Sequence, residues 1–351
     1  MLGAHSGEIL YRKAMVSAVA PLAGLSGGTF TPAKSTGPVQ GMDQPQDIRT
    51  TLREVYDQAA TVEDGRLASY IPELAAVDPS HFALSICDVQ GNTFHEGAHA
   101  QPFTLQSVSK VLSHGCVLGC HDEATIMQRV GVEPTGEDFD SIGKLDRDRR
   151  AFNPMVNAGA IAVTDLLISA YGRGALDRTL GFFAGTMDRA ALEIDEAVFR
   201  SEQRTGERNR AIAHLLNNFR LLDHPVEEVL ELYFQHCSIR ATTRDLARLG
   251  GTLANFGRVP GAGKRVLEVE CVRKVLSVML SCGMYNSAGQ WIYEVGLPAK
   301  SGVSGCVLIV VPGRMGIAAY SPRVDPRGSS RRSVLAARLL SERLGLHMFA
   351  P

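Results

Sequence analysis

The stretch FTLQSVSK at residues 103–110 places a serine and a lysine three positions apart at the start of an apolar helix. Its first four residues are extended in character, and apolar side chains then recur at helical spacing from Val108 to Leu118. Residues i and i+3 share one face of a helix and lie about 4.5 Å apart along its axis. We therefore expect the hydroxyl of Ser107 and the amine of Lys110 to meet where this helix begins.

This pair is typical of covalent catalysis, because a neutral lysine can take the proton of a serine and make it a nucleophile. The lysine pKa must then fall by roughly 3, from about 10.4, through burial or a nearby cation. The chain holds 29 Arg but only 7 Lys. Where arginine is so strongly preferred, a lysine is expected to do something that arginine cannot, such as give up a proton. Lys300, in KSG at 300–302, strengthens the prediction of catalysis.

A chance match is the alternative, because a chain of this length contains about one S-x-x-K by composition alone. A second copy, SIGK at 141–144, lies in a charged stretch with no apolar helix behind it. We interpret that copy as accidental and the copy at 107–110 as functional.

Composition limits the classes of function. The 351 residues are 45% hydrophobic with a net charge of -1, enough for one large domain or two intimate subdomains. The balanced charge and the single Trp argue against a nucleic-acid partner, and no apolar run is long enough to span a membrane. The 7 cysteines are scattered without a C-x-x-C pair, which indicates reduced thiols and a cytoplasmic protein.

The N-terminal region differs from the rest of the chain. The Ala-rich segment 14–25 follows two basic residues and is similar to a signal peptide, but Glu8 and Pro21 do not suit one. Because the region is rich in Gly, Pro, Ser and Thr, we expect a flexible extension over 1–45, with export and a start at Met42 as open alternatives.

Strand patterns lie near both ends of the chain and helical patterns fill the middle, which predicts an α+β protein with an antiparallel sheet flanked by helices and a helical subdomain. We expect a catalytic domain over 46–351, with its α/β part at about 46–120 and 286–351 and its helical part at about 121–285. The pattern predicts helices over 48–60, 64–76 and much of 122–280, with polar loops near 133–153 and 200–210. It predicts strands over 82–87, 93–95, 291–295, 301–311 and 315–320. A final helix is expected to run to Leu344, with Ser329 or Ser330 as its N-cap.

The segment HEGAH at 95–99 matches the zinc-protease pattern H-E-x-x-H. That chemistry requires a helix, whereas this match lies at a strand end and contains Gly97, so we expect the two histidines to stand about 13 Å apart. Two histidines and two cysteines around the Ser107 helix (His114, Cys116, Cys120 and His121) suit core packing at least as well as metal binding. We predict no metal site.

Six motifs, in matching order, resemble those of the serine-dependent glutaminases over about residues 70–321. They are QSVSK (106–110), NPMVNAGAI (153–161), SEQRTGERN (201–209), YFQHCSI (233–239), CGMY (282–285) and LPAKSGV (297–303). The resemblance implies a β-lactamase-like fold and hydrolysis of L-glutamine to L-glutamate and ammonia, with no cofactor. It also implies a homodimer or homotetramer.

The resemblance assigns a role to each matching residue. Ser107 matches the family nucleophile, Lys110 its base and Tyr285 a proton relay. The backbone N–H groups of Ser107 and Val303 match the oxyanion hole. The residues that match the substrate-binding set are Tyr70, Ser107, Asn157, Glu202, Asn209, Tyr233, Tyr285 and Val303.

These residue types suit a free amino acid, since Glu202 can hold an ammonium while amide and phenol groups donate to a carboxylate. Without the resemblance, other interpretations stay open. Asn157 would be a helix cap, Glu202 part of a solvated charged loop, and Tyr233 and Tyr285 core aromatics.

The rival function is a penicillin-recognising acyl transferase or a β-lactamase-like hydrolase, which shares S-x-x-K and K-S/T-G. Those enzymes add an S-x-N-like element and normally work outside the cytoplasm. The Asn-containing motifs here differ from that element, which favours the glutaminase. A non-enzymatic scaffold is disfavoured, because every family functional group is present.

Overall fold

The structure, a computed structural model, describes residues 45–136 and 149–350. These residues belong to one compact unit that spans 42–351. The predicted extension over 1–45, apart from Pro45, and the second S-x-x-K at 141–144 lie outside the described residues. The predicted division of 46–351 into an α/β part and a helical part stays a prediction.

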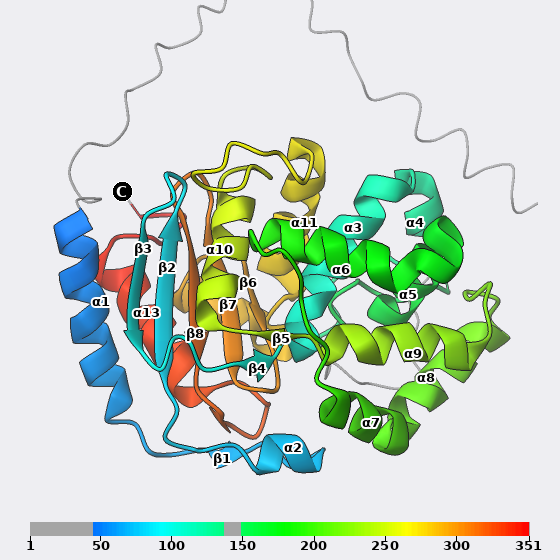
Figure 1. Ribbon diagram of the computed structural model, residues 1–351, viewed down its shortest axis with the longest axis horizontal. Coiled ribbons are helices and arrows are strands. Elements are labelled where there is room, and N and C mark those ends of the chain that lie inside the picture. The colour runs from blue at the N-terminus through cyan, green and yellow to red at the C-terminus, as the bar shows by residue number, and fades with distance from the viewer. Residues whose placement is uncertain (1–44, 137–148, 351) are drawn as a thin grey trace, which may run out of the picture. The chain divides into compact units, whose positions relative to one another are not determined.

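A five-stranded antiparallel sheet with the order β3-β2-β8-β7-β6 confirms the predicted sheet (Figure 1). Strands from opposite ends of the chain pair at its centre, where Ile86 lies opposite Ile317. The strands are β2 (Ala83–Asp88), β3 (Thr93–Gly97), β6 (Ala299–Ser301), β7 (Cys306–Val311) and β8 (Met315–Tyr320).

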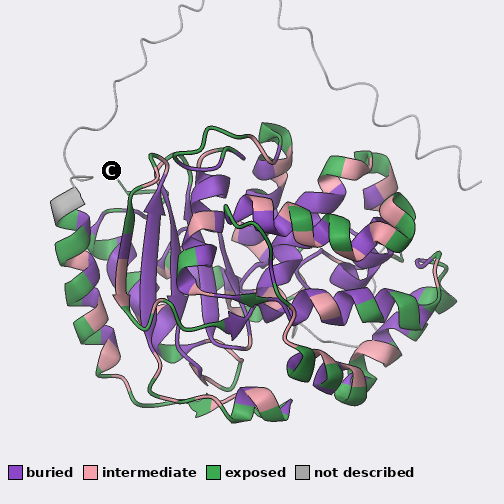
Figure 2. Ribbon diagram, in the orientation of Figure 1, coloured by how far each residue is buried: buried purple, intermediate pink, exposed green. Residues whose placement is uncertain are grey.

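Helices cover both faces of the sheet, so its central strands are buried on both sides (Figure 2). Ile309 and its alternate neighbours share a hydrophobic core with α1 (Pro45–Ala60) and α13 (Arg331–Arg343). Leu308, which points the other way, shares a second core with α10 (Thr243–Ala254). This burial explains why β7 is a nearly continuous apolar run without visible alternation.

Glycines let α10 lie directly on the sheet. A Cβ added at Gly316 of β8 would stand 2.1 Å from the backbone nitrogen of Gly251, and one added at Gly250 would stand 2.8 Å from the Cα of Gly316. Any side chain at these positions would push the helix away from the strand.

The remaining elements form the helical side of the unit and the connections around it. The longer helices are α3 (Ser109–Cys120), α5 (Asn157–Tyr171), α6 (Ala175–Thr186), α7 (Glu196–Thr205), α8 (Glu207–Asn218), α9 (Val226–Cys237) and α11 (Val269–Cys282). The short helices are α2 (Pro72–Ala75), α4 (Glu123–Arg129) and α12 (Ala288–Glu294), and the 3₁₀ turns are η1 (Gln106–Val108), η2 (Gly172–Gly174) and η3 (Tyr285–Ser287). Two pairs of short strands complete the fold: β1 (Arg66–Leu67) pairs with β9 (Arg323–Val324), and β4 (Phe103–Thr104) pairs with β5 (Arg240–Ala241).

Three predicted elements were wrong. The predicted helix over 64–76 is β1 and the single turn α2, because Ile71 precedes Pro72 and is extended. The predicted strand over 291–295 is the end of α12, a helix of 7 residues whose apolar run is too short to show its period. The predicted loop near 200–210 is the end of α7 and the start of α8, whose many charges hid the helical pattern. A fourth element differs in part: the strand predicted over 301–311 is divided by a turn into the end of β6 and the whole of β7.

The expected separation of His95 and His99 was also wrong, because their rings stack with centroids 4.7 Å apart. The chain turns back after Gly97, which has φ +71. The groups on α3 do not converge, since the His121 ring bonds the carbonyl of Leu166 and the thiol of Cys116 faces the hydroxyl of Tyr171. Over residues 45–136 and 149–350, no group of three or more His, Cys, Asp or Glu is arranged to hold a metal ion.

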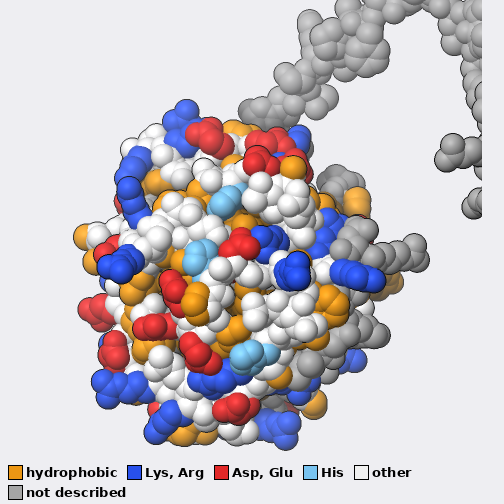
Figure 3. Space-filling view, turned by 90° about the vertical axis from the view of Figure 1, so that its right-hand side faces the viewer, with side chains coloured by type: hydrophobic (Ala, Val, Ile, Leu, Met, Phe, Trp, Pro, Cys, Tyr) orange, Lys and Arg blue, Asp and Glu red, His pale blue; other side chains and the backbone are white. Residues whose placement is uncertain are grey.

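Surface charge and helix length bear on the expected partners. Basic and acidic side chains are interspersed on the face shown in Figure 3. Within the part of the chain that the structure describes, no helix combines the length and the apolar character needed to cross a membrane.

Candidate active site

The side chains of Ser107 and Lys110 meet, as the spacing predicts. Ser107 lies in η1 and Lys110 in the first turn of α3, and the Lys110 Nζ donates to the Ser107 Oγ at 2.9 Å. Lys110 is 1% exposed. The amine and the hydroxyl therefore meet at a position shielded from bulk solvent.

The backbone before Ser107 is held in an unusual conformation. Gln106 has φ +48, which is costly for a residue with a side chain. The Ser109 hydroxyl donates to the Gln106 carbonyl at 2.7 Å, and the Leu105 N–H bonds the Ile239 carbonyl at 2.9 Å next to the β4–β5 pair. These contacts fix the turn that presents Ser107.

Asn157 connects Lys110 to a second helix. Its Oδ1 accepts from the Lys110 Nζ at 2.6 Å, and its Nδ2 donates to the Asn209 Oδ1 at 2.9 Å. Asn157 is the first residue of α5, and the cap residue is Val156, so the interpretation of Asn157 as a helix cap was wrong. A Cβ at Gly159 would stand 1.9 Å from the Asn153 carbonyl oxygen, so only glycine allows the chain to pack here.

Glu202 is a buried carboxyl group on α7 rather than part of a solvated loop. It is 1% exposed, and burial raises its pKa to about 8. The Tyr70 hydroxyl donates to it and also lies 3.5 Å from the Gln106 Oε1. Tyr70 therefore joins the carboxyl group to the turn that carries Ser107.

Tyr233 of α9 is buried beside the same groups. Burial is the main reason that its pKa is raised, and the charges of Glu202 and Tyr285 add to the effect. Its hydroxyl is therefore a neutral donor at physiological pH.

Tyr285 lies next to both buried lysines. The Lys300 Nζ donates to the Tyr285 hydroxyl at 2.6 Å, and the Lys110 Nζ lies 5.9 Å from the centroid of the tyrosine ring. Burial and then the charge of Lys110 lower the pKa of Lys300. Tyr285 has φ +54, a second strained position at the site.

Val303 lies in the turn between β6 and β7, beside η1. A Cβ at Gly302 would stand 2.8 Å from the Leu105 carbonyl oxygen, which shows how closely this turn approaches the Ser107 turn. Val303 also packs against a small apolar group made of Ile71, Leu74 and Val198, here called the satellite cluster. This cluster joins the Tyr70 segment, the Glu202 helix and the Val303 turn.

Two contacts at the site were not predicted from the sequence. Gln106 is 3% exposed and faces Tyr70, but nothing in its sequence context separates it from a core residue. The second contact is that of the Lys300 amine with the Tyr285 hydroxyl. The K-S-G motif identified the lysine but could not name its partner.

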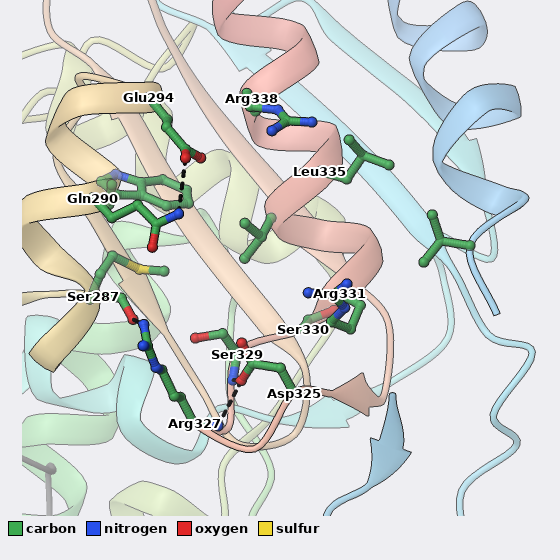
Figure 4. A pocket seen from close by; sticks show the side chains of 14 residues that line it. Ser287, Gln290, Glu294, Asp325, Arg327, Ser329, Ser330, Arg331, Leu335 and Arg338 are labelled. Carbon is green, nitrogen blue, oxygen red and sulfur yellow. Dashed lines mark hydrogen bonds between the residues drawn. The ribbon is translucent and has the colours of Figure 1, made fainter. Parts of the chain in front are cut away.

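A cavity of about 520 Å³ lies between α12 and α13, and none of the proposed catalytic side chains lines it (Figure 4). Its polar groups are largely engaged with one another: Arg327 bonds the Ser287 hydroxyl, Gln290 bonds Glu294, and Arg331 pairs with Asp64. Among its lining residues, Met284 and Ser287 flank the Tyr285 turn of the site.

The family model described as Glutaminase matches residues 65–349. The chain belongs to the glutaminase family. A glutaminase of Trichormus variabilis is 45% identical over 306 residues, which cover 87% of this chain and 91% of that one. The match to the family model thus covers nearly all of the described residues.

Solved structures agree with this assignment. A probable glutaminase of Bacillus subtilis is 31% identical with a TM-score of 0.78, covering 87% of this chain and 97% of that one. The protein Mglu in its glutamate form is 37% identical with a TM-score of 0.83, covering 87% of this chain and 70% of that one. Like the Bacillus subtilis structure, the chain has the β-lactamase-like fold.

Proposed function

We propose that this chain hydrolyses the side-chain amide of L-glutamine to L-glutamate and ammonia through a γ-glutamyl ester on Ser107. The observation that carries the proposal is the 2.9 Å contact between the Lys110 amine and the Ser107 hydroxyl. The family residues around it include the buried side chains of Asn157, Glu202 and Tyr233. The family membership supports the same reaction.

In the first half of the reaction, Lys110 takes the proton of Ser107, and the Oγ attacks the amide carbon of glutamine. The carbonyl oxygen becomes negatively charged and accepts hydrogen bonds from the backbone N–H groups of Ser107 and Val303. Each such donor typically contributes about 3 kcal/mol to the barrier reduction.

In the second half, the proton held by Lys110 passes to the leaving nitrogen, with Tyr285 as the relay, and ammonia departs. A water then attacks the γ-glutamyl ester with Lys110 again as base, which releases glutamate and restores Ser107. Lys300 orients the relay, because it donates to the Tyr285 hydroxyl.

The remaining polar groups bind the amino-acid part of the substrate. Glu202, with Tyr70 beside it, takes the ammonium group, while Asn157, Asn209 and Tyr233 surround the carboxylate. A buried carboxyl group without a cation holds its proton up to about pH 8. The substrate ammonium supplies the missing positive charge, so glutamine binding expels that proton.

Replacing Glu202 by Gln is expected to raise the KM for glutamine about 30-fold, because a charge-assisted hydrogen bond worth ~2 kcal/mol is lost. The pH dependence gives the sharper test. The wild-type carboxyl group must ionise to bind the ammonium, so kcat/KM falls with decreasing pH below about 8. In Glu202→Gln no carboxyl group has to ionise, so the plot of kcat/KM against pH is expected to be flatter below about pH 8. Equal slopes in both proteins would contradict this role.

The rival hydrolase function is separated by substrate. Ammonia release is measured with glutamine, asparagine and simple amides, beside hydrolysis of a chromogenic cephalosporin. We expect turnover with glutamine and none with the cephalosporin. Cephalosporin turnover without ammonia release from glutamine would favour the penicillin-recognising enzymes.

We infer that the enzyme acts in the cytoplasm as a homodimer or homotetramer. The seven cysteines are all free thiols, which suits a reducing compartment. Large apolar side chains on the surface, such as Tyr293 at 86% exposed, suit an interface between copies. Sedimentation velocity of the purified chain measures the number of subunits.

A further inference from the structure

A pocket of about 320 Å³ opens between α3, α4 and α11, and its lining residues include none of the proposed catalytic side chains. Its apolar walls include Leu118, Ile126, Val130 and Val278. An apolar cavity of roughly 150 Å³ is known to hold benzene, so this one has room for two fused rings.

His114 gives this pocket a polar group that has no partner. Its side chain lines the pocket and is 4% exposed, yet neither ring nitrogen has a hydrogen-bond partner among residues 45–136 and 149–350. Buried polar groups are nearly always paired in native proteins, because an unpaired group loses its bonds to water without replacement. The ring therefore points to a missing ligand atom.

The charges at the pocket favour an uncharged ligand. Burial lowers the pKa of His114 to about 4, with a smaller effect of Lys274, so the ring is neutral and offers one N–H and one acceptor nitrogen. At the rim, the Lys274 amine lies 3.0 Å from the Glu123 carboxylate, and Arg273 pairs with Glu270. These cations are already neutralised.

We propose that this pocket binds a small uncharged aromatic compound of about two rings with one hydroxyl group, which hydrogen-bonds to His114. A hydroxyl group both donates and accepts, so it fits either nitrogen of a neutral imidazole. The site is separate from glutamine hydrolysis and does not depend on it.

Binding of 2-naphthol and of naphthalene, measured by equilibrium dialysis, tests the hydroxyl requirement. In the wild type, 2-naphthol is expected to bind more tightly than naphthalene, because only 2-naphthol can hydrogen-bond to His114. In His114→Leu the ratio of the naphthalene Kd to the 2-naphthol Kd is expected to fall about tenfold, because this hydrogen bond is lost. Ser277→Trp, which fills the pocket from the surface of α11, is expected to weaken both probes.

The proposal is overturned if His114→Leu leaves the ratio unchanged. It is equally overturned if neither probe binds the wild type, in which case water alone satisfies the imidazole.

His236 provides a matched control, because its ring is equally buried but bonds the hydroxyls of Ser113 and Thr179. Without probe, His114→Leu is expected to raise the melting temperature, since an unpaired polar group is removed, whereas His236→Leu lowers it and keeps the wild-type ratio. A lower melting temperature in His114→Leu would show that the ring is already paired, which also contradicts the proposal.

Discussion

Ser107→Ala is expected to lose glutamine turnover by at least about ten-thousandfold while it still binds glutamine. The large loss follows from removal of the attacking oxygen, since water then has to act without a covalent intermediate. The binding groups on α5, α7 and α9 are untouched, and alanine fits the first turn of a helix. Ammonia release measures the first effect and calorimetric titration with glutamine the second.

Two other serines serve as controls for this variant. Ser141→Ala changes the other S-x-x-K of the chain and is expected to retain full turnover. Ser109→Ala removes the bond to the Gln106 carbonyl and is expected to reduce turnover far less than Ser107→Ala. An alanine variant at 107 that still hydrolyses glutamine would refute the nucleophile.

Lys110→Met is expected to lose nearly as much turnover as Ser107→Ala, because a serine without its base stays protonated. Methionine has a similar length and no charge, so the fold is expected to persist at this buried position. The Ser107→Ala/Lys110→Met double variant should be no slower than either single variant, since the two residues act as one unit.

Arginine separates the role of a base from that of a positive charge. Lys110→Arg keeps the charge but cannot give up its proton, so it is expected not to restore turnover. Lys264→Met, at an exposed lysine, is expected to have no effect. Substantial activity in Lys110→Arg would show that the site needs a cation here rather than a base.

The sequence predicts the elements whose pattern is long enough to be distinctive. The hairpin of β2 and β3 and the 13-residue α13, capped by Ser330, are found where alternation and capping placed them. Short elements fail, because α12 spans only two turns and its apolar residues match a strand equally well. The end of α7 and the start of α8 were predicted as a loop, because their many charged residues hid the helical pattern.

The same distinction separates the parts of the site. Ser107 and Lys110 are 3 positions apart, so helix geometry alone predicts their contact. Asn157 is 47 positions from Lys110, and Glu202 is 132 from Tyr70. Contacts at such distances depend on the tertiary fold, which no local pattern encodes, and only the family motifs placed these residues at one site.

The satellite cluster is a small apolar contact beside the proposed site. Only Ile71, Leu74 and Val198 are fully buried in it, whereas the cores on either face of the sheet are far more extensive. Segments held by few buried apolar contacts separate at the lowest free-energy cost. We therefore expect glutamate to leave by separation of the Tyr70 segment from α7, while Ser107 and Lys110, whose neighbours Val108, Val111 and Leu112 belong to the larger core, stay in place.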